Sequence, residues 1–399
     1  MQLPKLDGLR VTPGTRVLVR IDSNTPMQDG VITDDLRLTS VIPTIKSLQS
    51  RGAVVVLAGH LGRPTGVDQY QFSSAPKFSM EPVANRLSQL LDANVVLAPG
   101  IIGPAVKEVV SNATAGSLVM LENLRFASGE TTNSNQFTLG LVDLADAFVN
   151  EAFGASHRIH ASIVGPPAFL PCAAGYLLER EVGELGQLLN DPAQPFVAIL
   201  GGSKVSDKLG VIEALLNRCD TILVGGAMAF TFAVAIGGRV GNSLVETEMI
   251  ETCSRLINTG RIEIPTDVIA ASTMSNDAEV TICPILAIPE NMSGFDIGPA
   301  TTAKFVHRIG EAKTVLWNGP MGVFELTSFA NGTRGVTKAV AACSGHTVVG
   351  GGDSAAAVRQ MGLADQIDHV STGGGAALEF IELGDLPGLA ALRDAPTSK

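Results

Sequence analysis

The stretch FVAILGGSKVSDKLGVIEALL, residues 196–216, decides the fold class because it has the pattern of a strand, a glycine turn and a helix. FVAIL is a short continuous apolar run, which is typical of a strand buried on both faces. Gly201 and Gly202 then turn the chain, and LGVIEALL has the apolar content of a packed helix. Repeated units of this kind form parallel sheets covered by helices.

Apolar runs of the same kind recur along the chain, at residues 16–21, 53–59, 94–98, 117–121, 147–150, 221–225, 314–318 and 346–351. Helix-like stretches alternate with them, which is typical of an α/β fold with parallel sheets. The pattern restarts near residue 195, after a helix-like stretch that Asp191-Pro192 ends. The sequence therefore predicts two doubly wound, Rossmann-like domains, over residues 1–176 and 195–380, joined by a connecting helix over residues 177–194.

The composition limits the kinds of partner that we expect. The chain has 399 residues, which is long for one hydrophobic core, and a formal net charge of −11. An acidic surface repels nucleic acid and anionic lipid, so we expect neither as a partner. The five cysteines are scattered, and the first ten residues lack an apolar segment. We therefore expect a reducing, cytoplasmic setting and no signal peptide.

One stretch has the length of a membrane span. Residues 221–238 carry no charged side chain. Gly225 and Gly226 interrupt the stretch after a short β-branched run. We therefore predict a strand, a glycine turn and a helix there, and no membrane association.

Basic residues gather after the predicted strands of the first half of the chain. They are Arg37, His60, Arg63, Arg125, His157 and Arg158, and the polar residues Asp22 and Asn24 follow the first strand. Ligands of open α/β sheets bind at the carboxyl ends of the strands, so this set favours a site for a small polyanion. Any single arginine is more often a solvated surface charge. His157 and His160 have a metal-ligand spacing but lack a third ligand in register.

Glycines take the corresponding places in the second half. The glycine loops are Gly201-Gly202, Gly225-Gly226, Gly350-Gly351-Gly352 and Gly373-Gly374-Gly375. Glycine lets backbone N–H groups approach phosphate oxygens, and the N-terminus of a following helix adds positive potential. Several such loops in one domain favour a nucleotide site. Asp353 is then a candidate ligand of the nucleotide's Mg²⁺, with an ordinary helix N-cap as the alternative.

Lys204 and Lys208 lie four residues apart within the opening stretch. If a helix begins near Ser203, both lysines lie on one face near its first turn, where cations oppose the helix dipole. A bound anion would offset that cost, and solubilising surface lysines are the alternative. The stretch does not match a Walker A loop, G-x-x-x-x-G-K-[ST].

Taken together, these motifs resemble those of the phosphoglycerate kinase family, over essentially the whole chain and in the family's order. The matching segments are VLVRIDSNTP (17–26), DDLRL (34–38), GHLGRP (59–64), LENLRF (121–126), VNEAFGASHRIHAS (149–162), LGGSKVSDK (200–208), GGAMAFTF (225–232), FDIGPAT (295–301), LWNGPMGVFE (316–325), GGGDS (350–354) and STGGGAALEF (371–380).

The resemblance implies two domains facing a cleft, with 3-phosphoglycerate or 1,3-bisphosphoglycerate on the first and MgADP or MgATP on the second. It also implies that residues 381–399 return to the first domain. The residues that it assigns to the triose are Asp22, Asn24, Arg37, His60, Leu61, Gly62, Arg63, Arg125 and Arg158. Those that it assigns to the nucleotide are Gly201, Lys204, Lys208, Gly225, Gly226, Gly294, Asn318, Glu325, Gly351, Gly352, Asp353 and Ser354. Asp353 would serve Mg²⁺, and Gly373 and Gly374 would face the transferring group.

The implied reaction is reversible phosphoryl transfer between 1,3-bisphosphoglycerate and MgADP, giving 3-phosphoglycerate and MgATP, as in glycolysis and gluconeogenesis. The acceptor is a carboxylate, which carries no proton in neutral solution, so no general base is needed. Arg37 and Lys208 are the leading candidates for compensating charge on the transferring group once the domains close, with Lys204, Gly373 and Gly374 beside them. We expect the enzyme to be a monomeric phosphotransferase with a carboxyl group as acceptor.

Three residues depart from the family's usual motifs. Ser23 and Thr25 stand where Phe and Val are usual, and Glu151 stands where Asp is usual. None of them is an expected ligand. Two other functions share part of the pattern. A dinucleotide-dependent dehydrogenase requires G-x-G-x-x-G, whereas GGSKVS follows FVAIL. A non-catalytic nucleotide sensor would tolerate loss of the basic set, which is intact.

Overall fold

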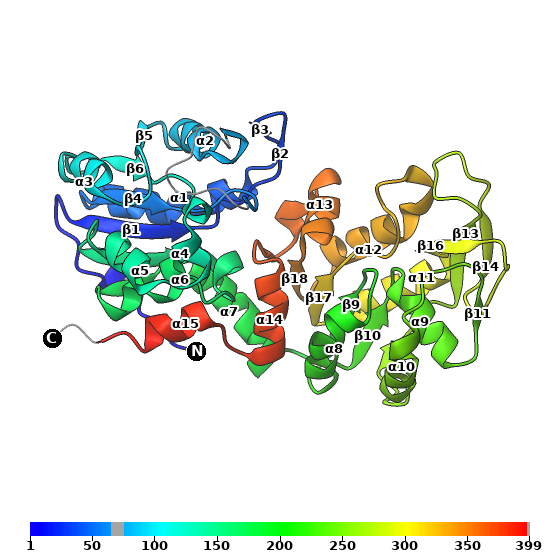
Figure 1. Ribbon diagram of the computed structural model, residues 1–399. Coiled ribbons are helices and arrows are strands. Elements are labelled where there is room, and N and C mark those ends of the chain that lie inside the picture. The colour runs from blue at the N-terminus through cyan, green and yellow to red at the C-terminus, as the bar shows by residue number, and fades with distance from the viewer. Residues whose placement is uncertain (65–75, 397–399) are drawn as a thin grey trace. The chain divides into compact units, whose positions relative to one another are not determined.

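A computed structural model describes residues 1–64 and 76–396 of the chain. The chain divides into two compact units, Met1–Gly183 with the C-terminal residues from Asp385 onward, and Glu184–Gly384. Each unit is an α/β fold built on a parallel sheet (Figure 1). The predicted pair of doubly wound, parallel-sheet units is therefore confirmed. The boundary between the units falls within helix α7 (Tyr176–Asn190), which lies where the connecting helix is predicted.

The parallel sheet of the first unit has the strand order β5-β6-β4-β1-β7-β8. Its strands are β1 (Arg16–Ile21), β4 (Val54–Ala58), β5 (Val95–Leu97), β6 (Leu118–Met120), β7 (Ala147–Glu151) and β8 (Cys172–Ala174). β1 lies inside the sheet and pairs in parallel with β4 on one side and with β7 on the other. The chain builds the β4 side first and then returns past β1, so the winding reverses there. Such a reversal is where open α/β sheets bind ligands.

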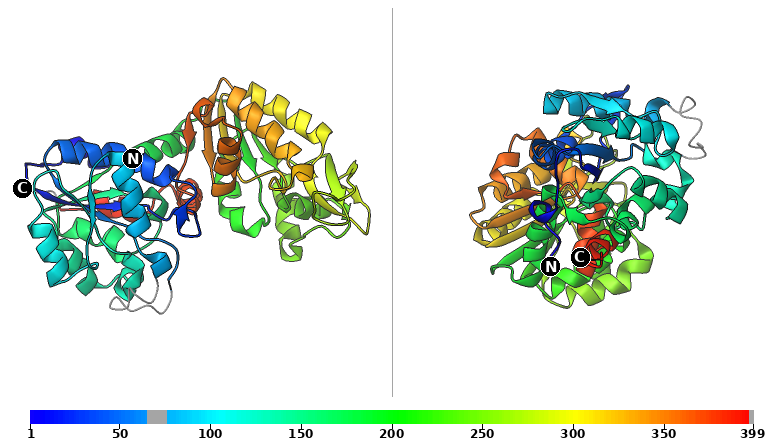
Figure 2. Two further views of the ribbon diagram at one scale, coloured as in Figure 1. Left: turned by 90° about the horizontal axis from the view of Figure 1, so that it is seen from above. Right: turned by 90° about the vertical axis from the view of Figure 1, so that its left-hand side faces the viewer.

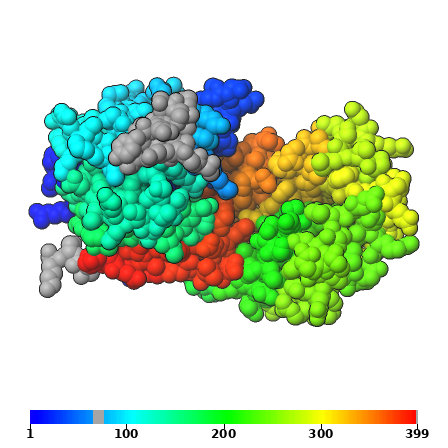
Figure 3. Space-filling view, in the orientation of Figure 1, coloured from blue at the N-terminus to red at the C-terminus, as the bar shows by residue number. Residues whose placement is uncertain are grey.

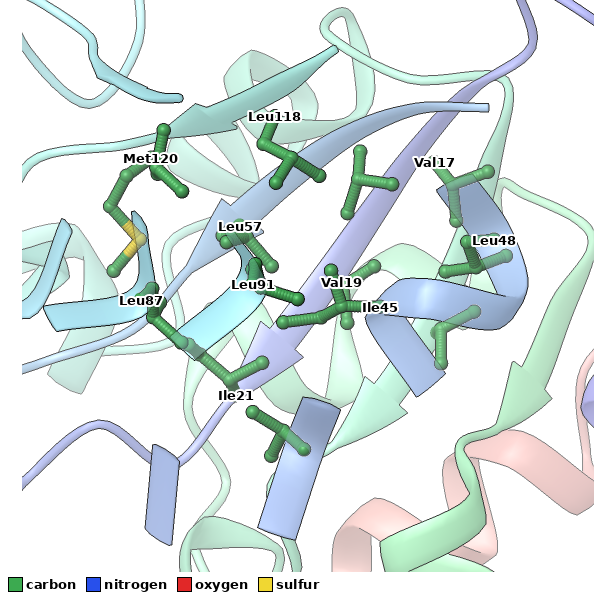
Figure 4. Close-up of a cluster of buried hydrophobic side chains, with 14 of the residues drawn as sticks. Val17, Val19, Ile21, Ile45, Leu48, Leu57, Leu87, Leu91, Leu118 and Met120 are labelled. Atoms are coloured by element: carbon green, nitrogen blue, oxygen red, sulfur yellow. The ribbon is translucent and has the colours of Figure 1, made fainter. Parts of the chain in front are cut away.

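Two helices, α1 (Leu36–Ser50) and α2 (Glu81–Leu91), cover one face of this sheet with apolar side chains. Figure 4 shows Val19 and Ile21 of β1 in the same buried cluster as Ile45 of α1 and Leu87 of α2. Every second residue of β1 belongs to this cluster because successive side chains of a strand point to opposite faces of the sheet. Figure 1 shows α4 (Ser128–Thr131), α5 (Asn135–Val142) and α6 (Ala161–Val164) on the opposite side of the sheet. The unit also contains α3 (Pro104–Ser111) and a short hairpin of β2 (Met27–Gln28) and β3 (Val31–Ile32).

The C-terminal helix α15 (Pro387–Arg393) packs on α6 and β8 of the first unit. Gly388 N donates a hydrogen bond to Ser156 O at 2.8 Å. Figure 3 shows the red surface of this segment against the teal surface of the first unit. The chain therefore leaves the first unit through α7 and returns to it at Asp385.

The parallel sheet of the second unit has the strand order β12-β10-β9-β17-β18-β19. Its strands are β9 (Phe196–Leu200), β10 (Thr221–Val224), β12 (Ile262–Glu263), β17 (Thr314–Asn318), β18 (His346–Gly350) and β19 (His369–Val370). β9 pairs in parallel with β10 and β17, as β1 does with β4 and β7. The winding therefore reverses at β9, directly before Gly201.

Helices cover both faces of this second sheet. On one face lie α11 (Pro299–Glu311), α12 (Asn331–Ala342) and α13 (Gly352–Gln360), which bury apolar side chains against Trp317 and its neighbours. Figure 2 shows α11 in yellow and α12 in orange side by side. The other helices are α8 (Leu209–Leu216), α9 (Met228–Ala235), α10 (Ile250–Ile257) and α14 (Gly375–Leu383), with α8 against α14 and α9 against α10.

The second unit also contains short strands that the apolar runs do not predict. They are β13 (Asp267–Ala271), β14 (Thr281–Pro284) and β16 (Ser293–Ile297) in an antiparallel ladder, and β11 (Arg239–Val240) paired with β15 (Ala287–Ile288). Residues 221–238 form β10, a glycine turn and α9, as predicted. Among the described residues, none belongs to a helix with the length and apolar character that crossing a membrane requires.

Candidate functional site

In the first unit, the residues predicted to bind the triose lie after strands that are neighbours in the sheet. Asp22 and Asn24 follow β1, the segment from His60 to Arg63 follows β4, Arg125 follows β6 and Arg158 follows β7. The sheet order β6-β4-β1-β7 brings these strand ends to one edge. The structure therefore places the predicted set together in one cluster.

Arg37 belongs to this cluster but does not follow a strand of the parallel sheet, so that part of the prediction is wrong. It lies in the first turn of α1, and its Nη1 is 3.0 Å from Asp22 Oδ2 and donates to Asn24 O at 3.1 Å. The side chain of Asn24 accepts a hydrogen bond from Gly62 N at 2.7 Å. These contacts tie α1 to the loops after β1 and β4, and the Arg37 side chain remains partly exposed.

Arg125 anchors the loop after β4 from the next strand. Its Nη1 donates to Gly62 O at 2.9 Å, and its buried Nε has no hydrogen-bond partner among the described residues. Burial lowers the pKa of Arg125, and the charges of Arg158, Arg20 and Arg63 lower it further. Arginines that repel one another in this way concentrate positive potential. A bound anion would relieve that repulsion and supply an acceptor for Nε.

His60 is buried, and its neighbours fix its charge state. Burial lowers the pKa of His60 well below its usual value, and the charges of Arg20 and Arg125 lower it further. Nη2 of Arg20 lies 3.3 Å from His60 Nδ1, and a guanidinium can only donate. His60 is therefore neutral, with Nδ1 as an acceptor and the proton on Nε2, which leaves Nε2 as a donor.

Arg20 belongs to a buried network of hydrogen bonds and charges. Arg20 Nε donates to Ser162 Oγ at 2.8 Å, and Ser162 Oγ donates to Glu130 Oε1 at 2.6 Å. Glu130 Oε1 also lies 3.5 Å from His160 Nδ1 and 3.9 Å from Arg20 Nη2. These residues are less than a tenth exposed. His160 thus contacts a carboxylate, and no cluster of three or more metal-ligating side chains is found in residues 1–64 and 76–396.

The three departures from the family's motifs have separate structural settings. Ser23 is buried and donates from Oγ to His60 O at 3.0 Å, which ties the loop after β1 to the loop after β4. Thr25 Oγ1 has no hydrogen-bond partner within the described part of the chain. Glu151 accepts hydrogen bonds from Leu177 N and Leu178 N, both at 3.1 Å, and so caps the N-terminus of α7. None of the three points to a lost ligand.

In the second unit, the predicted nucleotide residues also gather after neighbouring strands. The loops follow β10, β9, β17, β18 and β19, which are adjacent in that order. Gly226 and Gly319 have φ of 65° and 95°, which side chains rarely adopt. A Cβ at Gly226 would lie 2.5 Å from Gly202 N and O, and one at Gly201 would lie 1.9 Å from Pro320 O. Glycine is therefore required for the backbones of these loops to approach one another.

Lys208 reaches this set of loops from the end of the opening stretch. Its Nζ donates to Asn318 Oδ1 at the end of β17, and Asn318 O accepts from Gly201 N at 2.9 Å. Burial lowers the pKa of Lys208 to about 8, although the nearby charges of Asp207 and Asp353 act to raise it. A partly desolvated ammonium beside glycine loops is a strong site for a phosphate oxygen.

No helix begins near Ser203, so the condition for placing both lysines on one helix face is not met. The chain forms a 3₁₀ turn over Ser206–Lys208, and α8 begins at Leu209. Glu246 Oε2 accepts hydrogen bonds from Val205 N at 2.5 Å and Ser206 N at 3.2 Å, which satisfies these donors without a helix. Lys204 is exposed in the loop before the turn, and Lys208 is half-buried at its end. The two lysines therefore do not share one face of a helix.

A cavity of about 510 Å³ opens beside these loops within the second unit. Predicted residues in its wall are Gly226, Gly294, Glu325 and Asp353. Phe230 and Phe295 supply apolar surface, and a Cβ at Gly294 would lie 2.3 Å from the Phe230 ring. The mix of apolar walls and a few polar groups is that of a small-molecule site, with a volume that suits a nucleoside.

The N-termini of α13 and α14 also lie at this edge of the sheet. Gly351 caps α13 with φ 88°, and Gly374 caps α14 with φ 55°, and neither end has a side-chain cap. Asp353 is the second residue of α13, so the alternative that it is the N-cap is wrong. Ser354 Oγ accepts from Gly319 N at 2.6 Å, which joins the loop after β17 to α13. The uncapped N–H groups suit phosphate oxygens.

The donor set fits magnesium held through a nucleotide. Asp353 is exposed and lines the cavity, and its charge reaches Lys208. Mg²⁺ is usually bound by one or two carboxylates together with substrate phosphates and several waters. A single carboxylate at the mouth of a phosphate-binding loop set is consistent with that mode.

Comparisons with known proteins identify the family of the chain. The sequence model of phosphoglycerate kinase matches residues 7–383. The chain belongs to the phosphoglycerate kinase family. The phosphoglycerate kinase of Frankia casuarinae is 51% identical over 402 residues, which cover 97% of this chain and 99% of that protein. That of Thermosipho africanus is 46% identical, with 95% of each chain covered.

Solved phosphoglycerate kinases share the fold. The enzyme from Coxiella burnetii is 36% identical with a TM-score of 0.87, and the match covers 99% of this chain and 100% of that one. The enzyme from Pyrococcus horikoshii OT3 is 31% identical with a TM-score of 0.86, and 98% of each chain is covered. The resemblance seen in the motifs is therefore confirmed at the level of the family.

The structure of this phosphoglycerate kinase family member adds residues that the sequence does not single out. Arg20 contacts His60 and Glu130, Phe230 and Phe295 line the cavity of the second unit, and Glu246 holds the backbone at Val205. An arginine inside the apolar run RVLVRI is a usable signal for Arg20, because a charge in a doubly covered strand needs a buried partner. Glu246 has no such signal, since its partners are some forty residues away.

Proposed function

We propose that this protein catalyses the reversible transfer of a phosphoryl group between 1,3-bisphosphoglycerate and MgADP, giving 3-phosphoglycerate and MgATP. The observation that carries the proposal is the presence in one chain of two different anion sites. The first unit has a basic cluster at its strand ends, and the second has a glycine-lined cavity with Lys208 beside it. A kinase needs a site for each of its two phosphorylated substrates, and membership of the family gives their identity.

The basic cluster is proposed to hold the triose. Arg63, Arg125 and Arg158 would bind its phosphate, and His60 would donate from Nε2. Asp22, Asn24 and the backbone of Leu61 and Gly62 shape the loops that present these groups. In support, Arg125 Nε is a buried donor that lacks an acceptor in the described residues, and the arginines repel one another without an anion.

The cavity of the second unit is proposed to hold the nucleoside, with Glu325 at the ribose and Gly294 against the base. The glycine loops and the N-termini of α13 and α14 would then receive the phosphates, together with Lys204 and Ser354. Mg²⁺, held through Asp353 and the nucleotide, would supply charge neutralisation at the phosphate oxygens.

The chemistry of transfer is proposed to depend on alignment and charge compensation, because the carboxylate acceptor needs no base. Arg37 and Lys208 would approach the transferring group from its two ends, and the backbone of Gly373 and Gly374 would face it. These residues belong to separate units, so we propose that the units close on their substrates during each turnover. Closure would also exclude water, which limits hydrolysis of ATP.

Each proposed ligand set lies within one chain, so we propose a monomer. We also propose that the enzyme acts in the cytoplasm on small phosphorylated metabolites and not on nucleic acid. Its acidic net charge of −11 favours small anions held at local basic clusters over extended polyanions.

A coupled assay tests the proposal. The protein is incubated with 3-phosphoglycerate and MgATP, and the acyl phosphate formed is reduced by added glyceraldehyde-3-phosphate dehydrogenase with NADH. We expect NADH consumption that requires both substrates and the metal. Binding of the nicotinamide nucleotide by the protein itself would indicate a dehydrogenase. Binding of ATP without any turnover would indicate a nucleotide sensor. Either result would overturn the proposed kinase activity.

A further inference from the structure

Glu246 is a buried carboxylate that contacts the lysine loop, which we define as residues 203–208. It is 8% exposed and lies between β11 and the 3₁₀ turn Thr247–Met249. Its Oε2 accepts from Val205 N at 2.5 Å and from Ser206 N at 3.2 Å, and its Oε1 accepts from Ser206 Oγ at 2.5 Å. One carboxylate therefore satisfies three donors of the lysine loop, and both of its oxygens are used.

The surroundings of Glu246 favour its ionised form, which accepts these hydrogen bonds. Burial acts to raise the pKa of Glu246, but the hydrogen bonds from Ser206 and Val205 and the charge of Lys204 lower it, and the lowering prevails. Charge-assisted hydrogen bonds of this kind are stronger than neutral ones. The carboxylate thus holds the backbone of the lysine loop while lying close to one of its lysines.

The other side of Glu246 is fixed to the wall of the nucleotide cavity. Glu246 N donates to Thr231 Oγ1 of α9 at 3.1 Å, and Thr231 is itself buried. Phe230 of the same helix lines the cavity, as do Asn242 and Leu244 on the segment that leads to Glu246. The residue therefore links the surface that would receive the nucleoside to the loop that would receive the phosphates.

We propose that Glu246 is a positioning residue for phosphoryl transfer, which sets the place of Lys204 and Lys208 relative to a nucleotide in the cavity. The proposal rests on the proposed function. Lys208 N donates to Val205 O at 3.0 Å, so the backbone that Glu246 holds also carries the turn that aims Lys208 at Asn318. Displacement of a catalytic group by about 1 Å can reduce the rate on the order of a hundredfold.

Two variants separate hydrogen bonding from charge. In Glu246→Ala the buried N–H group of Val205 and the partly buried N–H group of Ser206 lose their acceptor. In Glu246→Gln the amide oxygen can accept from both N–H groups, and the amide nitrogen can donate to Ser206 Oγ. We expect Glu246→Ala to lower kcat by about ten- to a hundredfold, with KM for 3-phosphoglycerate changed by less than about twofold. Glu246→Gln should restore kcat to within about threefold of the wild type.

Asp368→Ala is the control for loss of a hydrogen-bonding carboxylate elsewhere in the second unit. Asp368 Oδ2 accepts from Thr347 N at 2.8 Å and Thr347 Oγ1 at 2.9 Å, so it also holds a backbone amide and a hydroxyl in the second unit. Thr347 lies at the amino end of β18, whereas the glycine loops follow the carboxyl ends of the strands. We expect Asp368→Ala to leave kcat within about twofold of the wild type, with folding of every variant checked by circular dichroism.

Hydrogen exchange gives a readout that does not depend on activity. In a peptide covering residues 201–209, Glu246→Ala should speed amide exchange by about tenfold or more, while Asp368→Ala should not change it. Unchanged exchange in Glu246→Ala would overturn the proposal, even if the wild type has no kinase activity. Equal loss of kcat in Glu246→Ala and Asp368→Ala would also overturn it, because the effect would then be general destabilisation.

Discussion

At the scale of single residues, Lys208 combines features that a surface lysine lacks. It is half-buried, it donates to Asn318 Oδ1, and burial lowers its pKa to about 8. A lysine placed only for solubility would be extended into water and would keep its ordinary pKa. These features favour a binding role for Lys208 over the alternative of a solubilising surface lysine.

The lowered pKa of Lys208 predicts a pH dependence of nucleotide binding. Below about pH 8 the ammonium is present and attracts the phosphates, and above that pH the free protein loses this charge. The affinity for ADP should therefore fall as pH rises through about 8. Lys208→Arg should keep its charge and show a flatter profile over the same range, since a guanidinium does not titrate there. Isothermal titration calorimetry from about pH 6.5 to 9.5 measures both.

ADP is fully ionised at the upper end of that range, so the charge of the ligand does not change there. Lys208→Arg binds the same ligand over the same range and is therefore the control for any effect of ADP ionisation. A wild-type profile that is as flat as that of Lys208→Arg would show that Lys208 does not meet the phosphates. A parallel fall in both proteins would assign the pH dependence to another group.

At the scale of elements, α7 begins on an unusual cap. Glu151, at the end of β7, is fully buried and accepts from Thr44 Oγ1 at 2.5 Å as well as from the first amides of α7. Burial raises the pKa of Glu151 to about 7, although those hydrogen bonds oppose the shift. The carboxylate thus joins α1, β7 and α7 within the first unit.

This cap requires glycine at residue 175. A Cβ at Gly175 would lie 2.1 Å from Glu151 Oε2, and the carboxylate cannot retreat because three donors hold it. Gly175→Ala should therefore lower the free energy of unfolding by about 1–3 kcal/mol. Shortening the acid in Gly175→Ala/Glu151→Asp should recover part of that loss relative to the sum of the single variants. Urea denaturation of the four proteins measures the coupling.

Gly183 offers the control within the same helix. A Cβ at Gly183 meets nothing within 4 Å, so Gly183→Ala should be neutral or stabilise α7 by up to about 1 kcal/mol. Equal effects of the two alanine substitutions would contradict the packing argument. Strictly additive effects of Gly175→Ala and Glu151→Asp would show that the two side chains do not compete for the same space.

Elements also show where prediction from sequence succeeds. Doubly covered strands such as β1 and β9 are predicted within a residue or two because their apolar runs are continuous. β14 and β16 are missed because their buried residues alternate with more exposed ones, so neither forms a continuous apolar run. β13 is buried over its last four residues, so its apolar run could have been predicted as a strand. α8 coincides with the apolar stretch LGVIEALL, as predicted. The loop before it depends on Glu246, which is distant in sequence and accepts the hydrogen bonds of Val205 N and Ser206 N.

At the scale of the whole molecule, the two units repeat one architectural plan with different chemistry. In each, the winding reverses at the first strand of the sheet, and the functional loops follow that strand and its neighbours. Arginines and His60 occupy these loops in the first unit, and glycines and Lys208 occupy them in the second. The residues at strand ends can thus be predicted from sequence, and Arg20 carries a sequence signal, while its partner Glu130 and the carboxylate of Glu246 require the fold.

The proposed function depends on direct transfer between two bound substrates, with Lys208 at the transferring group. A rapid-quench experiment with γ-³²P-labelled MgATP, 3-phosphoglycerate and enzyme in excess tests it most directly. The label should appear on the triose in the wild type without passing through the protein. Lys208→Ala should slow this step by about a hundredfold or more while the affinity for 3-phosphoglycerate stays the same. Label that first accumulates on the protein would rule out direct transfer, and an unchanged transfer rate in Lys208→Ala would rule out the role of Lys208.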